Sequence, residues 1–190
     1  MATPPLRSSR AFRTPAPATA IRFVLLNDEL DEQEGNGPAA SGRPVTHILD
    51  LTNLRNPKWT GTFYATDSKG IDHNLYIVDG LAYQSNYGAG IWVHDVRSIS
   101  KDPTGSKVSV EGFFDSYPED DSVGGIVQFV GTWSNFLFPS GYILVNTIER
   151  GAFVVKLASE RERGRGGCRV DLSKGFENKI VCDDDDNVLF

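Results

Sequence analysis

The sequence predicts an all-β fold, and three observations lead to that expectation. Glycine is abundant, with 19 residues in a chain of 190, and aromatic residues make up 11% of the total. Short apolar runs rich in β-branched and aromatic residues alternate with clusters of Gly, Pro, Asn and Asp, which is the usual pattern of strands joined by turns. One set of these runs also recurs along the chain at a fixed spacing. We therefore expect many short antiparallel strands and almost no α-helix.

The expected strands begin at residue 21 and continue as far as residue 157. Residues 21–26 form the first, and a run of acidic residues and then a loop rich in Gly, Pro and Ser follow it. Residues 45–51 and 59–65 form the next two, because Asn-Pro between them marks a turn. Further strands are expected at residues 91–96 and at about 107–115. With the hairpin described next and the strands that follow, about ten strands are expected in this part of the chain.

The strongest local signal is a β-hairpin centred on Asp79-Gly80. Apolar runs flank this dipeptide on both sides, at residues 74–78 and 81–86. Asp-Gly tolerates the positive φ angles of a type I′ turn, whose twist matches that of the two strands it joins. The dipeptide therefore predicts a tight turn between two paired strands.

A repeat predicts how the strands are grouped. Residues 79–96 can be laid over residues 140–157 without a gap, and residues 47–51 match residues 92–96 more weakly. Repeats of roughly 45 to 60 residues with about four short strands are typical of β-propeller blades, because a single blade needs neighbours to cover its two faces. The sequence thus predicts a partial β-propeller of about three blades over residues 21–157. A β-sandwich is the alternative.

The two ends of the chain differ from this central region. Residues 1–20 contain arginine and proline but no acidic residue, and both a targeting segment and a disordered one fit that composition. Residues 158–190 are charged and rich in glycine, which favours a mobile, solvated tail. This tail contains Cys168 and Cys182. A disulfide between them and two free thiols are both compatible with the sequence.

Composition argues against several classes of function. The net charge is −6 and no extended basic stripe is present, so a nucleic-acid partner is not expected. No apolar run reaches the length of a membrane-spanning helix. The glycines at residues 88 and 90 lie between two expected strands, without the helix that a phosphate-binding loop requires. We expect no cofactor.

Several segments together resemble the choice-of-anchor-B family of LVIVD-repeat β-propellers. They occur in the family's order and extend over roughly residues 21–157. The segments are LLNDELDE at residues 25–32, IDHNLY at 71–76, AYQSNYGAG at 82–90, GFFDSYP at 112–118, GTWS at 131–134, PSG at 139–141 and IERGAFVV at 148–155.

This resemblance implies a β-propeller outside the cell or at its surface, with no catalytic set to transfer. We therefore expect a non-enzymatic scaffold that binds a protein or carbohydrate partner. The segments resemble only the C-terminal part of a family member, and no secretory signal is recognisable. Both features suggest a truncated chain, whose uncovered blade faces are expected to favour self-association.

The candidate binding residues are aromatic or charged side chains near the expected turns: His73, Tyr83, Tyr87, Trp133 and Arg150. Aromatic rings either fill the layers between blades or line a ligand surface, and the sequence does not distinguish these roles. The alternative function is a hydrolase-type propeller with an acid/base site at His73, which lies beside Asp72. Because no Gly-x-Ser-x-Gly motif is present, we expect His73 to be structural and name no catalytic residue.

The acidic run after the first strand is a weak candidate for a cation site. Carboxylates favour hard cations such as Ca²⁺, but the spacing lacks the periodicity of an EF-hand loop. A solvated loop is the expected state, and folding is expected not to depend on a metal. The weak metal candidates are Asp28, Glu29, Asp31 and Glu32.

Overall fold

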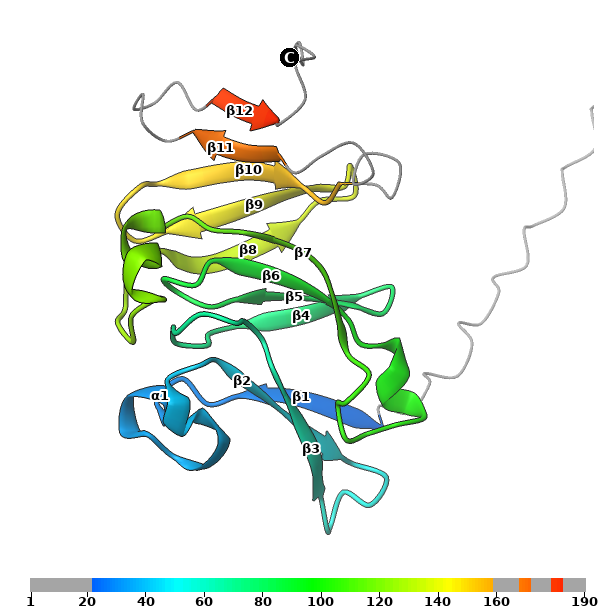
Figure 1. Ribbon diagram of the computed structural model, residues 1–190. Coiled ribbons are helices and arrows are strands. Elements are labelled where there is room, and N and C mark those ends of the chain that lie inside the picture. The colour runs from blue at the N-terminus through cyan, green and yellow to red at the C-terminus, as the bar shows by residue number, and fades with distance from the viewer. Residues whose placement is uncertain (1–21, 159–167, 172–178, 183–190) are drawn as a thin grey trace, which may run out of the picture.

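Three antiparallel sheets form the body of the protein, as seen in the computed structural model (Figure 1). The structure describes residues 22–158, 168–171 and 179–182, the last two ranges at the level of the backbone. The first sheet contains β1 (Phe23–Asn27), β2 (Val45–Asp50) and β3 (Lys58–Tyr64). The second contains β4 (Leu75–Val78), β5 (Leu81–Ser85), β6 (Ile91–Asp95) and β7 (Ser109–Phe114). The third contains β8 (Thr132–Leu137), β9 (Tyr142–Thr147) and β10 (Ala152–Lys156).

Helix is almost absent from the described residues. The single α-helix there, α1 (Asp31–Glu34), has four residues. Three short 3-10 helices complete the connections: η1 (Gly37–Ser41), η2 (Arg97–Ser100) and η3 (Pro118–Val123). The expected all-β fold, with ten strands between residues 22 and 158, is therefore confirmed. The sheets do not close into a ring within the described residues.

A further pair of strands lies in the C-terminal segment. Strands β11 (Cys168–Asp171) and β12 (Lys179–Cys182) pair antiparallel, and the register places Cys168 opposite Cys182. The expectation about residues 1–20 lies outside the described residues, as does most of the expectation about the tail.

The sheets lie one above another in Figure 1. Apolar side chains pack between them. Successive side chains of a strand point to opposite faces of its sheet. Strand β5 therefore contributes side chains to the cores on both sides of the middle sheet. Ala82 belongs to the core between the first and second sheets, together with Ile48 and Phe63. Tyr83 belongs to the core between the second and third sheets, with Ile143 as a neighbour. Both faces of the middle sheet are thus covered.

The outer face of the third sheet carries large apolar side chains that are exposed. Phe136 on β8 is 59% exposed and Val154 on β10 is 67% exposed. Their strand neighbours Leu137 and Phe153 point the other way and pack in the core. This face of the third sheet therefore presents apolar side chains to solvent.

No helix in the described part of the chain has the length and apolar character needed to cross a membrane.

The turn at Asp79-Gly80 is confirmed. Val78 and Leu81 are paired across it, and both turn residues have positive φ angles, 51° at Asp79 and 78° at Gly80. These angles are unfavourable for most side chains and least favourable for β-branched ones.

We expect Gly80→Val to lower the free energy of unfolding by about 2 kcal/mol, because valine is strained at this φ angle. Gly80→Asn is the control: it adds the same Cβ, which meets the Arg97 side chain, but asparagine tolerates positive φ. Urea unfolding of the three proteins gives the comparison. Equal losses for the two variants would show that crowding at Arg97, and not the turn geometry, determines the effect.

Candidate functional site

The connections at one end of the sheets hold almost all of the candidate residues. In Figure 1, α1 and the green coil of η3 lie on the left side of the molecule, whereas η2 lies on the right. The left end carries the connections β1–β2, β3–β4, β5–β6, β7–β8 and β9–β10. Two groups of side chains meet there: a carboxylate cluster of Asp31, Glu32 and Asp72, and an aromatic cluster of His73, Tyr87, Phe129 and Trp133.

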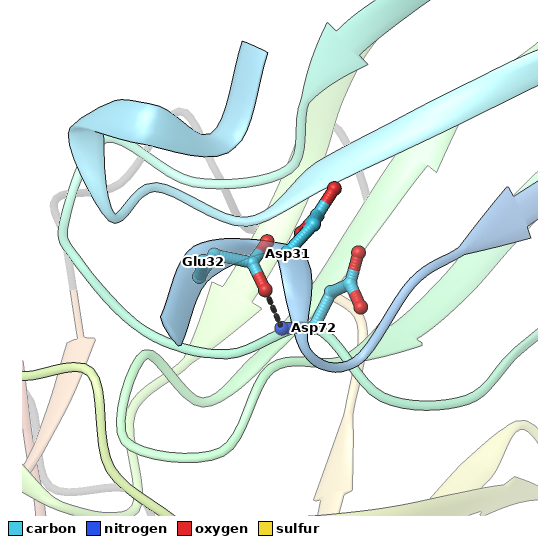
Figure 2. A group of neighbouring side chains, drawn as sticks. All are labelled: Asp31, Glu32 and Asp72. Atoms are coloured by element: carbon cyan, nitrogen blue, oxygen red, sulfur yellow. Dashed lines mark hydrogen bonds between the residues drawn. The ribbon is translucent and has the colours of Figure 1, made fainter. Parts of the chain in front are cut away.

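The carboxylate cluster joins two segments that are 40 residues apart in the sequence. Asp31 and Glu32 begin α1, and Asp72 lies in the β3–β4 connection. One ligand oxygen of each lies within 4.8 Å of those of the other two. Figure 2 shows the three side chains close together between these segments. All three residues are buried, with exposed fractions of 6%, 5% and 0%.

Glu32 owes its position to two backbone donors. The amide of Val45, the first residue of β2, donates to Glu32 Oε1 at 3.1 Å. The amide of Asp72 donates to Glu32 Oε2 at 3.4 Å, the bond drawn in Figure 2. Because both carboxylate oxygens accept backbone bonds, Glu32 ties α1 to β2 and to the β3–β4 connection. The expectation of a solvated acidic loop is wrong for Asp31 and Glu32.

Three oxygens of the cluster have no hydrogen-bond partner among the described residues: Asp31 Oδ1 and both carboxylate oxygens of Asp72. The remaining oxygen of Asp31, Oδ2, lies 3.3 Å from Nε2 of His47 on β2. Buried carboxylates normally have partners, since an unpaired one loses its hydration without compensation.

Burial and mutual repulsion raise the pKa values of two cluster members. Burial, together with the charge of Asp31, raises the pKa of Glu32 to about 8. Burial and the neighbouring carboxylates raise the pKa of Asp72 to about 9. At neutral pH the cluster therefore favours either bound protons or a bound cation.

The aromatic cluster lies beside the carboxylate cluster, because His73 directly follows Asp72. The centroid of the His73 ring lies 5.2 Å from that of Tyr87 and 5.7 Å from that of Trp133. The ring of Phe129 packs edge-on against Tyr87, at 5.1 Å between centroids. Tyr87 is buried, whereas Trp133 is 48% exposed and Phe129 is 44% exposed. The cluster thus has a buried ring at its base and two partly exposed rings.

Polar atoms fix the orientation of these rings. His73 Nδ1 donates to the carbonyl oxygen of Trp133 at 2.5 Å, and its Nε2 lies 3.7 Å from Glu29 Oε1. The hydroxyl of Tyr87 donates to the same Glu29 oxygen at 2.5 Å. Burial and this contact raise the pKa of Tyr87. Glu29 therefore faces both the phenol and the imidazole.

The backbone at Tyr87 directs its ring into this cluster. Tyr87 has a φ of 43°, a left-handed conformation that is uncommon outside glycine. Its carbonyl accepts bonds from the amides of Gly90 at 2.9 Å and Thr132 at 3.0 Å. The second of these bonds connects the β5–β6 turn to the start of β8, and so brings Tyr87 close to Trp133.

The structure brings together three of the five candidate binding residues: His73, Tyr87 and Trp133. Tyr83 lies elsewhere, in the core, where its ring stacks on Tyr76 at 5.5 Å between centroids. It faces the third sheet because it is an interior residue of β5, and is not a surface residue.

Arg150 is engaged outside the aromatic cluster. Its guanidinium forms an ion pair with Glu119 and lies 5.9 Å from the centroid of the Tyr117 ring. This charge-assisted contact ties the β9–β10 connection to η3 and keeps Arg150 apart from the aromatic cluster.

The weak metal candidates divide into two groups. Asp31 and Glu32 belong to the carboxylate cluster, whereas Glu29 contacts the aromatic cluster, and Asp28 is not one of the grouped carboxylates. Sequence reasoning missed Asp72 as the third carboxylate, and it missed Phe129. The only signal for Asp72 was its place beside His73, in a segment that the resemblance had singled out.

No protein-family model, curated protein or solved structure matches this chain.

Proposed function

We propose that this chain is a non-enzymatic binding module, part of a β-propeller that lies outside the cell or at its surface, and that it binds a glycan through the aromatic cluster. The stacking of three sheets with apolar interfaces supports the propeller arrangement. The cellular location rests on the LVIVD-repeat resemblance alone.

The observation that carries the binding proposal is the exposed indole of Trp133 beside fixed polar groups. A pyranose ring presents C–H groups that pack against the face of an aromatic ring, where the electrostatic potential is negative. Its hydroxyls need donors and acceptors at the rim of the same site. Trp133 and Phe129 provide exposed rings, and Glu29, which is 43% exposed at its side chain, provides the acceptor.

Two features favour a small polar ligand over a protein partner at this cluster. Tyr87 and His73 are held by hydrogen bonds, so their rings are already ordered before binding. The exposed aromatic surface is also local and bordered by charge. A protein interface would bury a wider apolar area with a charge-depleted centre. Self-association through the outer face of the third sheet remains a separate prediction.

The hydrolase alternative has one supporting observation, the approach of Glu29 to His73 Nε2 at 3.7 Å. The other two histidines lie away from this pair: His47 contacts Asp31 in the other cluster, and His94 is buried in the core. The binding proposal therefore accounts for more of the site.

We expect Trp133→Ala to weaken glycan binding at least tenfold, or about 1.4 kcal/mol, because it removes the exposed stacking surface. Phe136→Ala is the matched control, since it removes another exposed aromatic side chain from β8 on the opposite face of the sheet. Binding to a panel of soluble oligosaccharides is measured by calorimetry, and the products are analysed for cleavage.

Equal weakening by the two variants would contradict the assignment of the aromatic cluster. Cleavage that is lost in His73→Ala would favour the hydrolase alternative. Absence of binding across the panel would contradict glycan binding as the function.

A further inference from the structure

We propose that Asp31, Glu32 and Asp72 bind a divalent cation, with Ca²⁺ as the preferred ion, and that the ion links α1 to the β3–β4 connection. This proposal departs from the expectation that folding does not depend on a metal. It does not require that the aromatic cluster binds a glycan.

The geometry of the carboxylate cluster suits a bound ion. Three carboxylates from two distant segments converge on one space, with ligand atoms within 4.8 Å of one another (Figure 2). Oxygen atoms that coordinate one Ca²⁺ ion at 2.3–2.6 Å lie at most about 5 Å apart, twice that bond length. The separations in the cluster therefore suit one shared ion.

Within the described residues, Asp72 is buried with unpartnered carboxylate oxygens. The residue has an exposed fraction of 0%, and neither carboxylate oxygen has a hydrogen-bond partner among the described residues. Asp31 Oδ1 is also buried without a hydrogen-bond partner among the described residues. A carboxylate that only stabilised the fold would be expected to accept bonds from backbone amides, as Glu32 does. Asp72 instead directs unpaired oxygens into the cluster.

Charge also favours a bound cation. Asp28 and Glu29, in the β1–β2 connection, add further negative potential at Asp72. His47 Nε2 lies 3.3 Å from Asp31 Oδ2. A single imidazole does not balance three carboxylates. A divalent ion supplies the missing charge within the buried space.

The donor set selects the class of ion. All three side chains offer oxygen, which favours hard cations, and water molecules can complete the shell of a Ca²⁺ ion. Mg²⁺ demands near-octahedral geometry, which three carboxylates from a helix and a loop are less suited to provide. His47 fits the role of a neighbour that orients Asp31, because its Nε2 already faces Asp31 Oδ2.

The test is a titration of the full chain after treatment with a chelator. Ca²⁺ at about 100 times its Kd should raise the melting temperature by about 5 to 10 °C, because the ion binds the folded chain. Asp72→Asn should abolish this shift and, in chelator, should melt no lower than the parent, because it removes a buried carboxyl group whose oxygens have no hydrogen-bond partner among the described residues. Asp67→Asn is the matched control, since Asp67 lies in the same connection with a side chain that is 98% exposed. It should retain the full shift.

A second measurement locates the ion directly. Tb³⁺ replaces Ca²⁺ at oxygen sites and emits when a nearby tryptophan is excited. The Trp59 ring lies 5.9 Å from the ring of His47, which contacts Asp31, so Trp59 is a close donor. We expect sensitised emission that Ca²⁺ displaces and that falls strongly in both Asp72→Asn and Trp59→Phe.

Three outcomes would overturn the proposal. The parent chain shows no shift with Ca²⁺, Mg²⁺ or Mn²⁺; Asp72→Asn keeps the Ca²⁺ shift; or Tb³⁺ emission is unchanged in Asp72→Asn. The first outcome, combined with stabilisation by Asp72→Asn, would show that protons neutralise the cluster. Glycan binding that persists without Ca²⁺ leaves this proposal intact, so the two proposals fail independently.

Discussion

Gly61→Ala should lower the free energy of unfolding by about 3 kcal/mol, because the added methyl group has no space and its neighbours cannot yield. A Cβ at Gly61 on β3 would overlap the backbone of Thr104, with the Thr104 Cα at 2.5 Å and its carbonyl group closer still. Thr104 lies in the β6–β7 connection, so the contact joins the first sheet to the second. Urea unfolding measures the loss.

Gly112→Ala is the matched control for this prediction. Each glycine lies beside a register shift: Ile48 pairs with Gly61 next to one shift, and Val93 pairs with Gly112 next to another. A Cβ at Gly112 would meet only the end of the Leu157 side chain, at 2.6 Å, which can move aside. Its loss should stay below about 1 kcal/mol. Similar losses at both positions would mean that the strand geometry, and not the Thr104 backbone, requires glycine.

Features of the fold that depend on neighbouring residues were predictable from the sequence. The Asp79-Gly80 turn follows from two residues that tolerate positive φ angles. The match between residues 79–96 and 140–157 aligned β5 with β9 and β6 with β10. Strands β5 and β9 are interior strands of their sheets, and β6 and β10 are their hydrogen-bonded neighbours. Strand limits were accurate to within about two residues, as in β1, because apolar patterns fade gradually at strand ends.

The carboxylate cluster was not predictable, because its burial is decided by contacts across 40 residues of sequence. Nothing near Glu32 in the chain indicates that the amides of Val45 and Asp72 will bind its two oxygens. An acidic run is usually solvated, and that generalisation failed here for two of its members.

The positions of two tyrosines in the β5 region were likewise not predictable from the residues around them. Tyr83 and Tyr87 are four residues apart, and both looked like surface candidates. Alternation along β5 places Tyr83 in the core. Tyr87 follows the end of that strand, and its φ of 43° is what turns it toward His73. A propensity argument does not anticipate a left-handed tyrosine.

The remaining histidine, His94, occupies the core as a neutral side chain. It is 1% exposed and lies between the rings of Phe63, at 5.4 Å, and Trp92, at 6.3 Å between centroids. Its Nε2 donates to the carbonyl of Ala65 at 2.9 Å, and Nδ1 has no partner among the described residues. Burial lowers the pKa of His94 to about 4, from an ordinary value near 6.5.

This burial should give His94 a contribution to stability that weakens in acid, and His94→Gln should remove that contribution. Between pH 6.5 and pH 4 the unfolded chain binds a proton at His94 and the folded chain does not, so the contribution of His94 to the free energy of unfolding falls as pH falls. The loss is about 1.4 kcal/mol per pH unit and sums to about 3 kcal/mol. Glu32, Asp72 and Asp115 have raised pKa values and act in the opposite direction over this range. They are present in both proteins, so their effects cancel when the free energy of unfolding of the variant is subtracted from that of the parent.

Glutamine stays neutral and keeps a donor for Ala65. The excess free energy of unfolding of the parent over His94→Gln, measured by urea unfolding, should therefore decrease steadily from pH 6.5 to pH 4. A difference that does not change with pH would mean that His94 titrates alike in the folded and unfolded chains.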